Sequence, residues 1–226
     1  MPVELSELLP DLPEEDRAGL EKWWGAGAEH RWGIGERPAI VVVDMTRAFV
    51  EDRFPSGWAK TGEPCAESIR RLLDVARPAG IPIFYTVTEP LAGAEVGAWL
   101  RGRPTPSTFP FDGPPEAHEI VDILTPEPGE IVIKKPKPSA FYATQLEGML
   151  NYVGADSLIV TGMTTSGCVR ATVNDAFNLN YRVTVPLECV ADRSQLSHRV
   201  ELLDMTAKYA DLSKLDEVIE VIGSRA

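Results

Sequence analysis

The chain has 226 residues, of which 44% are apolar and 25% charged, and its formal net charge at pH 7 is −12. This length and composition are typical of one large globular domain with a well-buried core. So acidic a chain is a poor candidate for nonspecific binding to nucleic acid or to an anionic membrane. No apolar run approaches the roughly 20 residues that a membrane-spanning helix needs, so no membrane partner is expected.

The amino-terminal stretch MPVELSELLPDLPEEDR is acidic and lacks the basic and apolar blocks of a secretory signal peptide. We therefore expect a cytoplasmic protein. The three cysteines, Cys65, Cys168 and Cys189, are odd in number and do not pair at the spacing of a metal site. In a reducing compartment this pattern predicts free thiols.

Residues 1–35 are interpreted as an amino-terminal arm, followed by a single globular domain over residues 36–226. The leucines within residues 5–12 predict a short amphipathic helix. The stretch KWWGAGAEHRWGIGERP, rich in glycine and tryptophan, comes next. Its adjacent tryptophans, Trp23 and Trp24, favour docking on the core or on another subunit rather than ligand binding.

Beyond Pro38 the pattern alternates between predicted strands and helices. Residues 39–43, AIVVV, form a continuous apolar run that is typical of a strand buried on both faces. Further strands are predicted over residues 81–87, 130–134, 157–161, 181–185 and 218–222. Helices are predicted over residues 66–76, 139–151, 167–178 and 195–209. Residues 89–118, rich in glycine and proline, are predicted to form a long loop.

This alternation predicts an α/β domain, a doubly wound fold of three layers in which helices cover both faces of a six-stranded, mainly parallel sheet. Ligands of such sheets bind beyond the carboxyl ends of the strands. The side chains that follow each predicted strand are therefore the first candidates for chemistry.

An acid, an amine and a thiol follow three of these strands. Asp44 follows the first strand, Lys134 and Lys135 follow the third, and the loop after the fourth carries Cys168. A single aspartate at this place is more often a helix cap, and a single lysine is more often a solvated charge. Their convergence at one edge of the sheet favours a catalytic site instead.

The setting of Cys168 points to a reactive thiol. It lies in TGMTTSGCVRAT, residues 161–172, where Thr165, Ser166 and Gly167 are good turn and N-cap residues. Backbone amides and the helix dipole at such a turn favour a thiolate and an oxyanion. The alternative, a small buried structural cysteine, is the preferred interpretation for the two other cysteines.

These residues resemble the isochorismatase-like cysteine hydrolases. The resemblance rests on Asp44 at the end of the first strand, on K-x-x-x-S-A-F at 135–141, and on G-x-x-T-x-x-C-V at 162–169. It extends from about residue 33 to the carboxyl terminus. The strings TSGCVRAT, AFNLNYRVTVPLECVADR and LLDMTAKYADL are more specific and resemble the branch of N-carbamoylsarcosine amidases and maleamate amidohydrolases.

The resemblance implies a catalytic set of Asp44, Lys135 and Cys168, since the family's lysine precedes the serine of SAF by four residues. It implies that the aspartate accepts the thiol proton, that the lysine stabilises charge, and that the thiolate attacks an amide to form a thioester. The implied oxyanion hole uses the amides of Thr164 and Cys168, next to a cis peptide between Met163 and Thr164. It also implies a homo-oligomer, either dimer or tetramer, without a cofactor.

Two other kinds of site are excluded by the pattern. The glycines of residues 25–35 precede the first strand, whereas a dinucleotide fingerprint follows it. No metal is expected, because the histidines His30, His118 and His198 are far apart and match no common ligand spacing. Surface positions are expected for all three histidines.

The substrate implied by the branch is a small amide that carries a carboxylate. Arg193 follows the fifth strand, 25 residues after Cys168, and a matching arginine of the branch binds the substrate carboxylate. A guanidinium can hold a carboxylate in bidentate fashion. The alternatives are that Arg193 pairs with Asp192 or another surface acid, or that Arg170 is the anchor. The sequence does not choose between N-carbamoylsarcosine-like and maleamate-like substrates. Hydrolysis of other small ureas or amides, and a non-catalytic binding or assembly role, remain as alternatives.

Overall fold

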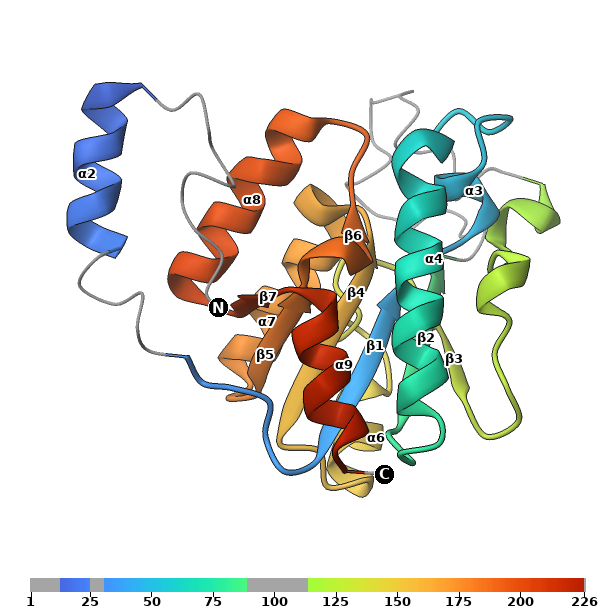
Figure 1. Cartoon of the computed structure of the whole chain (residues 1–226). Coiled ribbons are helices and arrows are strands. Elements are labelled where there is room, and N and C mark those ends of the chain that lie inside the picture. Colours follow the sequence, from blue (N-terminus) through green and yellow to red (C-terminus); the bar gives the residue numbers. More distant parts are fainter. Residues whose placement is uncertain (1–12, 25–30, 89–113, 226) are drawn as a thin grey trace.

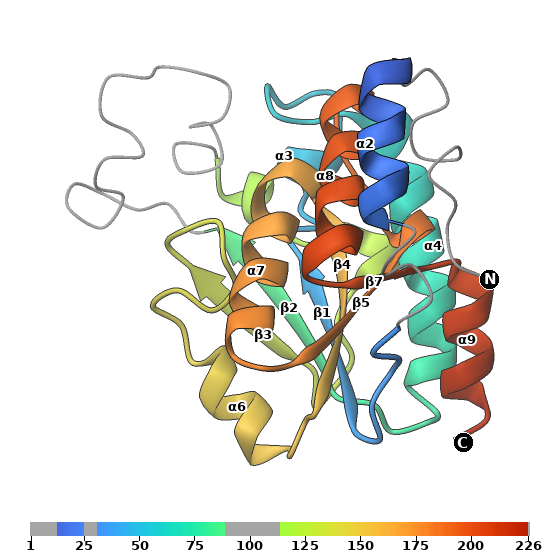
Figure 2. The ribbon, with the colours of Figure 1, turned by 90° about the vertical axis from the view of Figure 1, so that its left-hand side faces the viewer.

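A parallel sheet lies at the centre of the molecule, between two layers of helices (Figures 1 and 2). The computed structural model describes residues 13–24, 31–88 and 114–225. The sheet has seven strands in the order β3-β2-β1-β4-β5-β7, with β6 paired to β4, and every pair is parallel. The strands are β1 (Pro38–Val43), β2 (Ile83–Thr88), β3 (Ile131–Lys135), β4 (Ser157–Met163), β5 (Arg182–Pro186), β6 (Val190–Ala191) and β7 (Asp211–Ser213).

The apolar run of β1 explains its central place, because its residues are buried on both faces of the sheet. Val41 and Val43 face a core that includes buried residues of α6 (Leu146–Tyr152), α7 (Arg170–Asn178) and α8 (Gln195–Lys208). Ile40 and Val42 face the opposite core, formed with α4 (Ala59–Ala76) and α9 (Leu215–Gly223). Side chains that alternate along β1 therefore pack against both layers of helices.

The remaining helical segments are short, apart from α2 (Glu14–Trp24), which lies outside the layers beyond α8 in Figure 1. Leu20 of α2 packs against the edge of the core. The short segments are α3 (Arg47–Val50), the 3₁₀ turns η4 (Pro115–His118), η5 (Asp122–Leu124) and η7 (Leu187–Cys189), and the π-helical turn η6 (Thr165–Val169). None of the described helices combines the length and the apolar character that crossing a membrane requires.

Several predictions for the arm and the long loop fall outside the described residues. These are the helix over residues 5–12, the docking of the Trp23 and Trp24 side chains, and most of the loop over residues 89–118. The division at residue 35 also stays a prediction. Gly33 and Gly35, within the predicted arm, donate amide hydrogen bonds to Asp211 and Ser157 of the sheet.

The sixth predicted strand, residues 218–222, is wrong because this stretch lies in α9. Leu215, Val218 and Ile222 recur at helical spacing and are buried together, so the short apolar run is one face of a helix. The strand that borders β5 is instead β7, which is only three residues long. The predicted helix over residues 139–151 is also too long, since α6 begins at Leu146 and turns precede it.

The carboxyl ends of the strands share one edge of the sheet, at the top of Figure 1. The segments that follow β1, β3, β4 and β6 therefore meet there. Gly162 in β4 makes this edge compact: its φ is +108°, and a Cβ at this position would lie 2.0 Å from the carbonyl oxygen of Val43 in β1. Only glycine fits so close an approach of two strands.

Gly162→Ala is therefore expected to lower the free energy of unfolding by on the order of 3 kcal/mol or more, because the methyl group collides with backbone. Urea unfolding would measure the change. Gly148→Ala is the control, since Gly148 lies in α6, its φ is not positive, and a methyl group there would meet no atom within 4 Å. That change should be neutral or stabilising by about 0.5–1 kcal/mol. Similar stability of Gly162→Ala and the wild type would contradict the expectation.

Candidate active site

Asp44 directly follows β1 and is completely buried. Its φ of +49° lies in the left-handed region, which is uncommon for residues other than glycine but which aspartate tolerates. The backbone amide donates to both the carbonyl oxygen (3.1 Å) and the hydroxyl oxygen (3.2 Å) of Thr86 in β2. The Thr86 hydroxyl in turn donates to Oδ1 of Asp44 over 2.8 Å. These bonds fix both the backbone and the carboxylate.

Lys135 is the last residue of β3, and its side chain contacts Asp44 at the end of β1, although β2 lies between these two strands. Its Nζ lies 2.8 Å from Oδ2 of Asp44 and 3.4 Å from Sγ of Cys168, and it also donates to the carbonyl oxygen of Lys137 over 3.1 Å. The side chains of Lys135 and Asp44 are both 0% exposed. Lys134, by contrast, is exposed. Of the two adjacent lysines, the one indicated by the SAF spacing is thus the one that contacts the aspartate and the cysteine.

Cys168 lies in η6, the turn that joins β4 to α7, and is 7% exposed. Its carbonyl oxygen accepts a hydrogen bond from the hydroxyl of Thr172 over 2.7 Å. The same hydroxyl oxygen accepts from the amide of Ala140, over 3.0 Å. Ala140 belongs to the SAF element, so this chain of bonds ties that element to the start of the cysteine-bearing helix. Asp44, Lys135 and Cys168 are brought together as the sequence predicted.

The electrostatics of this cluster differ from the expected ready-made thiolate. Burial and the adjacent Asp44 carboxylate raise the pKa of Cys168 to about 12, although the Lys135 ammonium opposes the rise. Burial favours a neutral Lys135, but Asp44 and Cys168 raise the pKa of this lysine above its ordinary value. The cluster therefore holds an ion pair beside a protonated thiol. A proton acceptor must accompany any attack by sulfur.

The amides of the cysteine turn are also shared differently from the expectation. The buried carboxylate of Asp192 accepts hydrogen bonds at Oδ2 from the amide of Ser166 (2.9 Å) and from its hydroxyl (2.7 Å). Asp192 comes directly after β6, which pairs with β4 in the register Met163↔Ala191. One amide at the start of the turn thus donates to the aspartate. The negative charge of this carboxylate also weakens the positive potential of the helix amino terminus that would favour a thiolate.

Two histidines expected at the surface are instead half-buried and hydrogen-bonded. Nδ1 of His198 lies 2.8 Å from the hydroxyl oxygen of Thr165 in the cysteine turn, and burial lowers the pKa of this histidine while Asp192 opposes the shift. Nδ1 of His118 lies 2.7 Å from the carbonyl oxygen of Thr88. The error arose because sequence spacing shows metal-ligand patterns but not contacts between distant segments.

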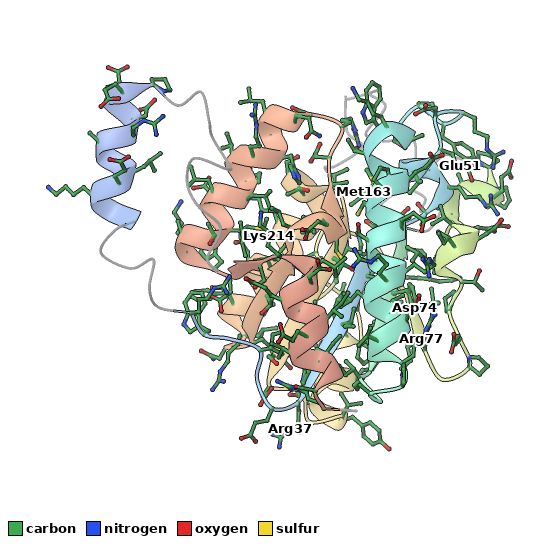
Figure 3. All side chains as sticks on the ribbon, in the orientation of Figure 1. Arg37, Glu51, Asp74, Arg77, Met163 and Lys214 are labelled. Atoms are coloured by element: carbon green, nitrogen blue, oxygen red, sulfur yellow. The ribbon has the colours of Figure 1, made fainter. Side chains whose placement is uncertain are left out.

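A cis peptide joins Met163 to Thr164, at the place that the family resemblance implied. The carbonyl oxygen of Thr164 accepts from the amides of Gly167 (2.9 Å) and Val169 (3.2 Å). The Thr164 amide has no hydrogen-bond partner among the described residues. Met163, labelled in Figure 3, is completely buried, and its sulfur lies close to Gly62 of α4. One backbone donor directly before the cysteine turn is thus left available for a ligand.

Arg193 follows Asp192 and is exposed. Because β6 pairs with the end of β4, Arg193 emerges at the same sheet edge as the cysteine turn. It makes no ion pair with another described residue, and Asp192 is occupied by Ser166 instead. Arg170, the other candidate anchor, pairs with Glu201 over 3.0 Å. Within residues 13–24, 31–88 and 114–225, no three side chains of His, Cys, Asp or Glu gather as metal ligands would.

The family model of the isochorismatase domain matches residues 38–217. The chain belongs to the isochorismatase family. It is 33% identical to an N-carbamoylsarcosine amidase of Arthrobacter over 225 residues, which cover 97% of this chain and 84% of that protein. It is 32% identical to a maleamate amidohydrolase of Pseudomonas putida over 191 residues, 84% of this chain and 86% of that protein. The resemblance found in the sequence is thereby confirmed.

A solved structure shares the fold. The crystal structure of a cysteine hydrolase from Pseudomonas syringae pv. phaseolicola superposes with a TM-score of 0.75 at 23% identity, covering 87% of this chain and 97% of that one. The predicted α/β architecture is therefore confirmed, with seven strands in place of six. In the present chain, Asp44 follows β1 and Lys135 is the last residue of β3. Cys168 lies in the turn that follows β4.

The three thiols are expected to differ in reactivity, with Cys168 alkylated first by iodoacetamide at neutral pH. Cys65 and Cys189 are 2% and 0% exposed, and burial raises the pKa of both beyond that of Cys168. Peptide mass mapping over time would measure the order. The labelling rate of Cys168 should rise with pH, because its thiolate population grows up to a pKa of about 12. In urea the three thiols should become alike, and earlier labelling of Cys65 or Cys189 in the folded protein would contradict the expectation.

Proposed function

We propose that the protein is a cysteine-dependent amidohydrolase that releases ammonia from a small amide bearing a carboxylate. The observation that carries the proposal is the buried contact of Lys135 with both Asp44 and Cys168. The cluster thus combines a nucleophile, the thiol, with an acid–base group, the carboxylate, and a fixed cation, the lysine. The amidohydrolase relatives support hydrolysis of a C–N bond.

The first step in the proposed reaction is proton transfer from Cys168 to Asp44. The raised pKa of the thiol means that the thiolate is unfavourable before a substrate arrives. Lys135 lies 3.4 Å from the sulfur and offsets part of the cost of its negative charge. As the sulfur forms a bond to the amide carbon, the carbonyl π electrons move to oxygen.

The oxyanion so formed would accept hydrogen bonds from the amides of Thr164 and Cys168. When the tetrahedral intermediate collapses, the C–N bond breaks and Asp44 returns its proton to the nitrogen, so that ammonia leaves. A thioester to Cys168 remains. Water then loses a proton to Asp44 and attacks the thioester, the C–S bond breaks, and the thiol recovers the proton. The products are a carboxylic acid and the original enzyme.

Arg193 is the proposed anchor for the substrate carboxylate. Its exposure and its place after β6, beside the cysteine turn, leave its guanidinium accessible to a ligand. A carboxylate held at the far end would place the amide carbon at the sulfur. N-carbamoylsarcosine-like and maleamate-like amides both meet this description. Homo-oligomeric assembly in the cytoplasm is part of the proposal and follows from the resemblance and composition.

The proposal is tested by an ammonia-release screen over small amides, ureas and carbamoyl amino acids, with EDTA present throughout. Activity is expected on at least one carboxylate-bearing amide, and Cys168→Ala should abolish it because the nucleophile is lost. Cys65→Ala is the matched control and should stay active, since Cys65 is a buried thiol of α4 in the core on the opposite face of the sheet from Cys168. Full activity of Cys168→Ala would exclude the covalent mechanism. Absence of ammonia release from every compound would favour the non-catalytic alternative.

Arg193→Ala should lose on the order of 2–4 kcal/mol of transition-state stabilisation towards a carboxylate substrate, measured as kcat/KM. The loss should be far smaller for a neutral amide of similar size, because only the carboxylate needs the guanidinium. Arg170→Ala is the control, as Arg170 already pairs with Glu201. Equal losses on charged and neutral substrates would make Arg193 structural and would overturn the proposed substrate class.

A further inference from the structure

Thr86 makes three hydrogen bonds with Asp44, although its part in the site was not visible in the sequence. It lies in β2 directly beside Val43, the last residue of β1. It is completely buried, so its hydroxyl is shielded from solvent. Its carbonyl and hydroxyl oxygens both accept the Asp44 amide, at 3.1 and 3.2 Å, and its hydroxyl donates to Oδ1 at 2.8 Å.

These hydrogen bonds fix the direction in which the Thr86 hydroxyl donates its proton. A hydroxyl has one proton, and a carboxylate oxygen can only accept, so this proton is directed at Oδ1 of Asp44. The oxygen of the hydroxyl is directed at the Asp44 amide. Rotation of the carboxylate about its χ2 bond would break the 2.8 Å bond to Thr86. Oδ2 therefore remains the oxygen that lies against Nζ of Lys135, at 2.8 Å.

We propose that Thr86 is a positioning residue that assigns the two oxygens of Asp44 to separate tasks. Oδ1 is held by the Thr86 hydroxyl, and Oδ2 exchanges the proton with Cys168 while it contacts Lys135. This inference rests on the proposed amidohydrolase function, because it specifies how the proton acceptor of that reaction is oriented. Without the hydroxyl, the carboxylate is free to turn both oxygens towards the lysine and away from the thiol.

A purely structural role is the competing explanation, since buried threonine is a common strand residue. Thr161 provides the matched comparison. It is also completely buried in a central strand, β4, and its hydroxyl donates over 3.2 Å to a backbone carbonyl, that of Val41. Its side chain thus resembles Thr86 in burial and hydrogen bonding, but its partner belongs to no catalytic group.

The experiment compares Thr86→Val, Thr86→Ser and Thr161→Val with the wild type. For each variant, kcat and KM for ammonia release, the rate of Cys168 alkylation by iodoacetamide, and the melting temperature are measured. Thr86→Val keeps the side-chain shape but loses the hydroxyl, so kcat should fall by about tenfold or more while KM stays within about twofold. The alkylation rate should fall as well, because the thiol loses an oriented proton acceptor.

Thr86→Ser restores the hydroxyl and should recover most of both rates, and Thr161→Val should change the melting temperature without changing either rate. Unchanged kcat and alkylation in Thr86→Val would overturn the proposal, and so would equal losses in Thr161→Val. If no amide is hydrolysed, the proposed function fails on its own, while the alkylation rates of Thr86→Val and Thr86→Ser still decide whether Thr86 orients Asp44. Should Thr86→Val fail to fold, Thr86→Ala, measured against Thr86→Ser, gives the same comparison.

Discussion

The buried ion pair between Lys135 and Asp44 is the constraint on which the arrangement of the site depends. Two side chains that are 0% exposed carry opposite charges 2.8 Å apart, and each would be costly to bury alone. Strands β1 and β3 are not neighbours, because β2 lies between them. The pair therefore forms only if β1 and β3 keep their register with β2, in which Thr86 lies opposite both Val43 and Ile133. Loss of either partner would leave an uncompensated charge inside the sheet edge.

Burial next to this ion pair also favours the neutral form of the Cys168 thiol. Burial is the main cause that raises the pKa of Cys168 to about 12; the Asp44 carboxylate adds to the rise and the Lys135 ammonium opposes it. The thiol is thus held in its neutral form, and in the proposed reaction it becomes nucleophilic only when its proton passes to Asp44. A neutral thiol reacts more slowly with alkylating and oxidising agents than a thiolate does.

Much of the fold and the centre of the site could be predicted from the sequence. The apolar run before Asp44 and the spacing from Lys135 to SAF are local patterns, and parallel-sheet topology brings their ends together. The strand over residues 218–222 was misassigned because a short apolar run fits a helix face as well as a strand. Thr86, Asp192 and His198 were missed because their roles depend on contacts between segments far apart in the chain. The dipole at Cys168 was overestimated for the same reason, since the Asp192 carboxylate at Ser166 has no local signature.

The two-residue strand β6 fixes the position of the segment that follows it relative to the cysteine turn. It is hydrogen-bonded to the last residues of β4, the same strand that delivers the cysteine turn. Asp192 then adds a second link between the two turns through Ser166. The distance between the cysteine turn and the segment after β6 is consequently fixed by hydrogen bonds between neighbouring backbone segments. In the proposed reaction, a fixed separation between the sulfur and Arg193 would select substrates by the number of bonds between their amide and their carboxylate.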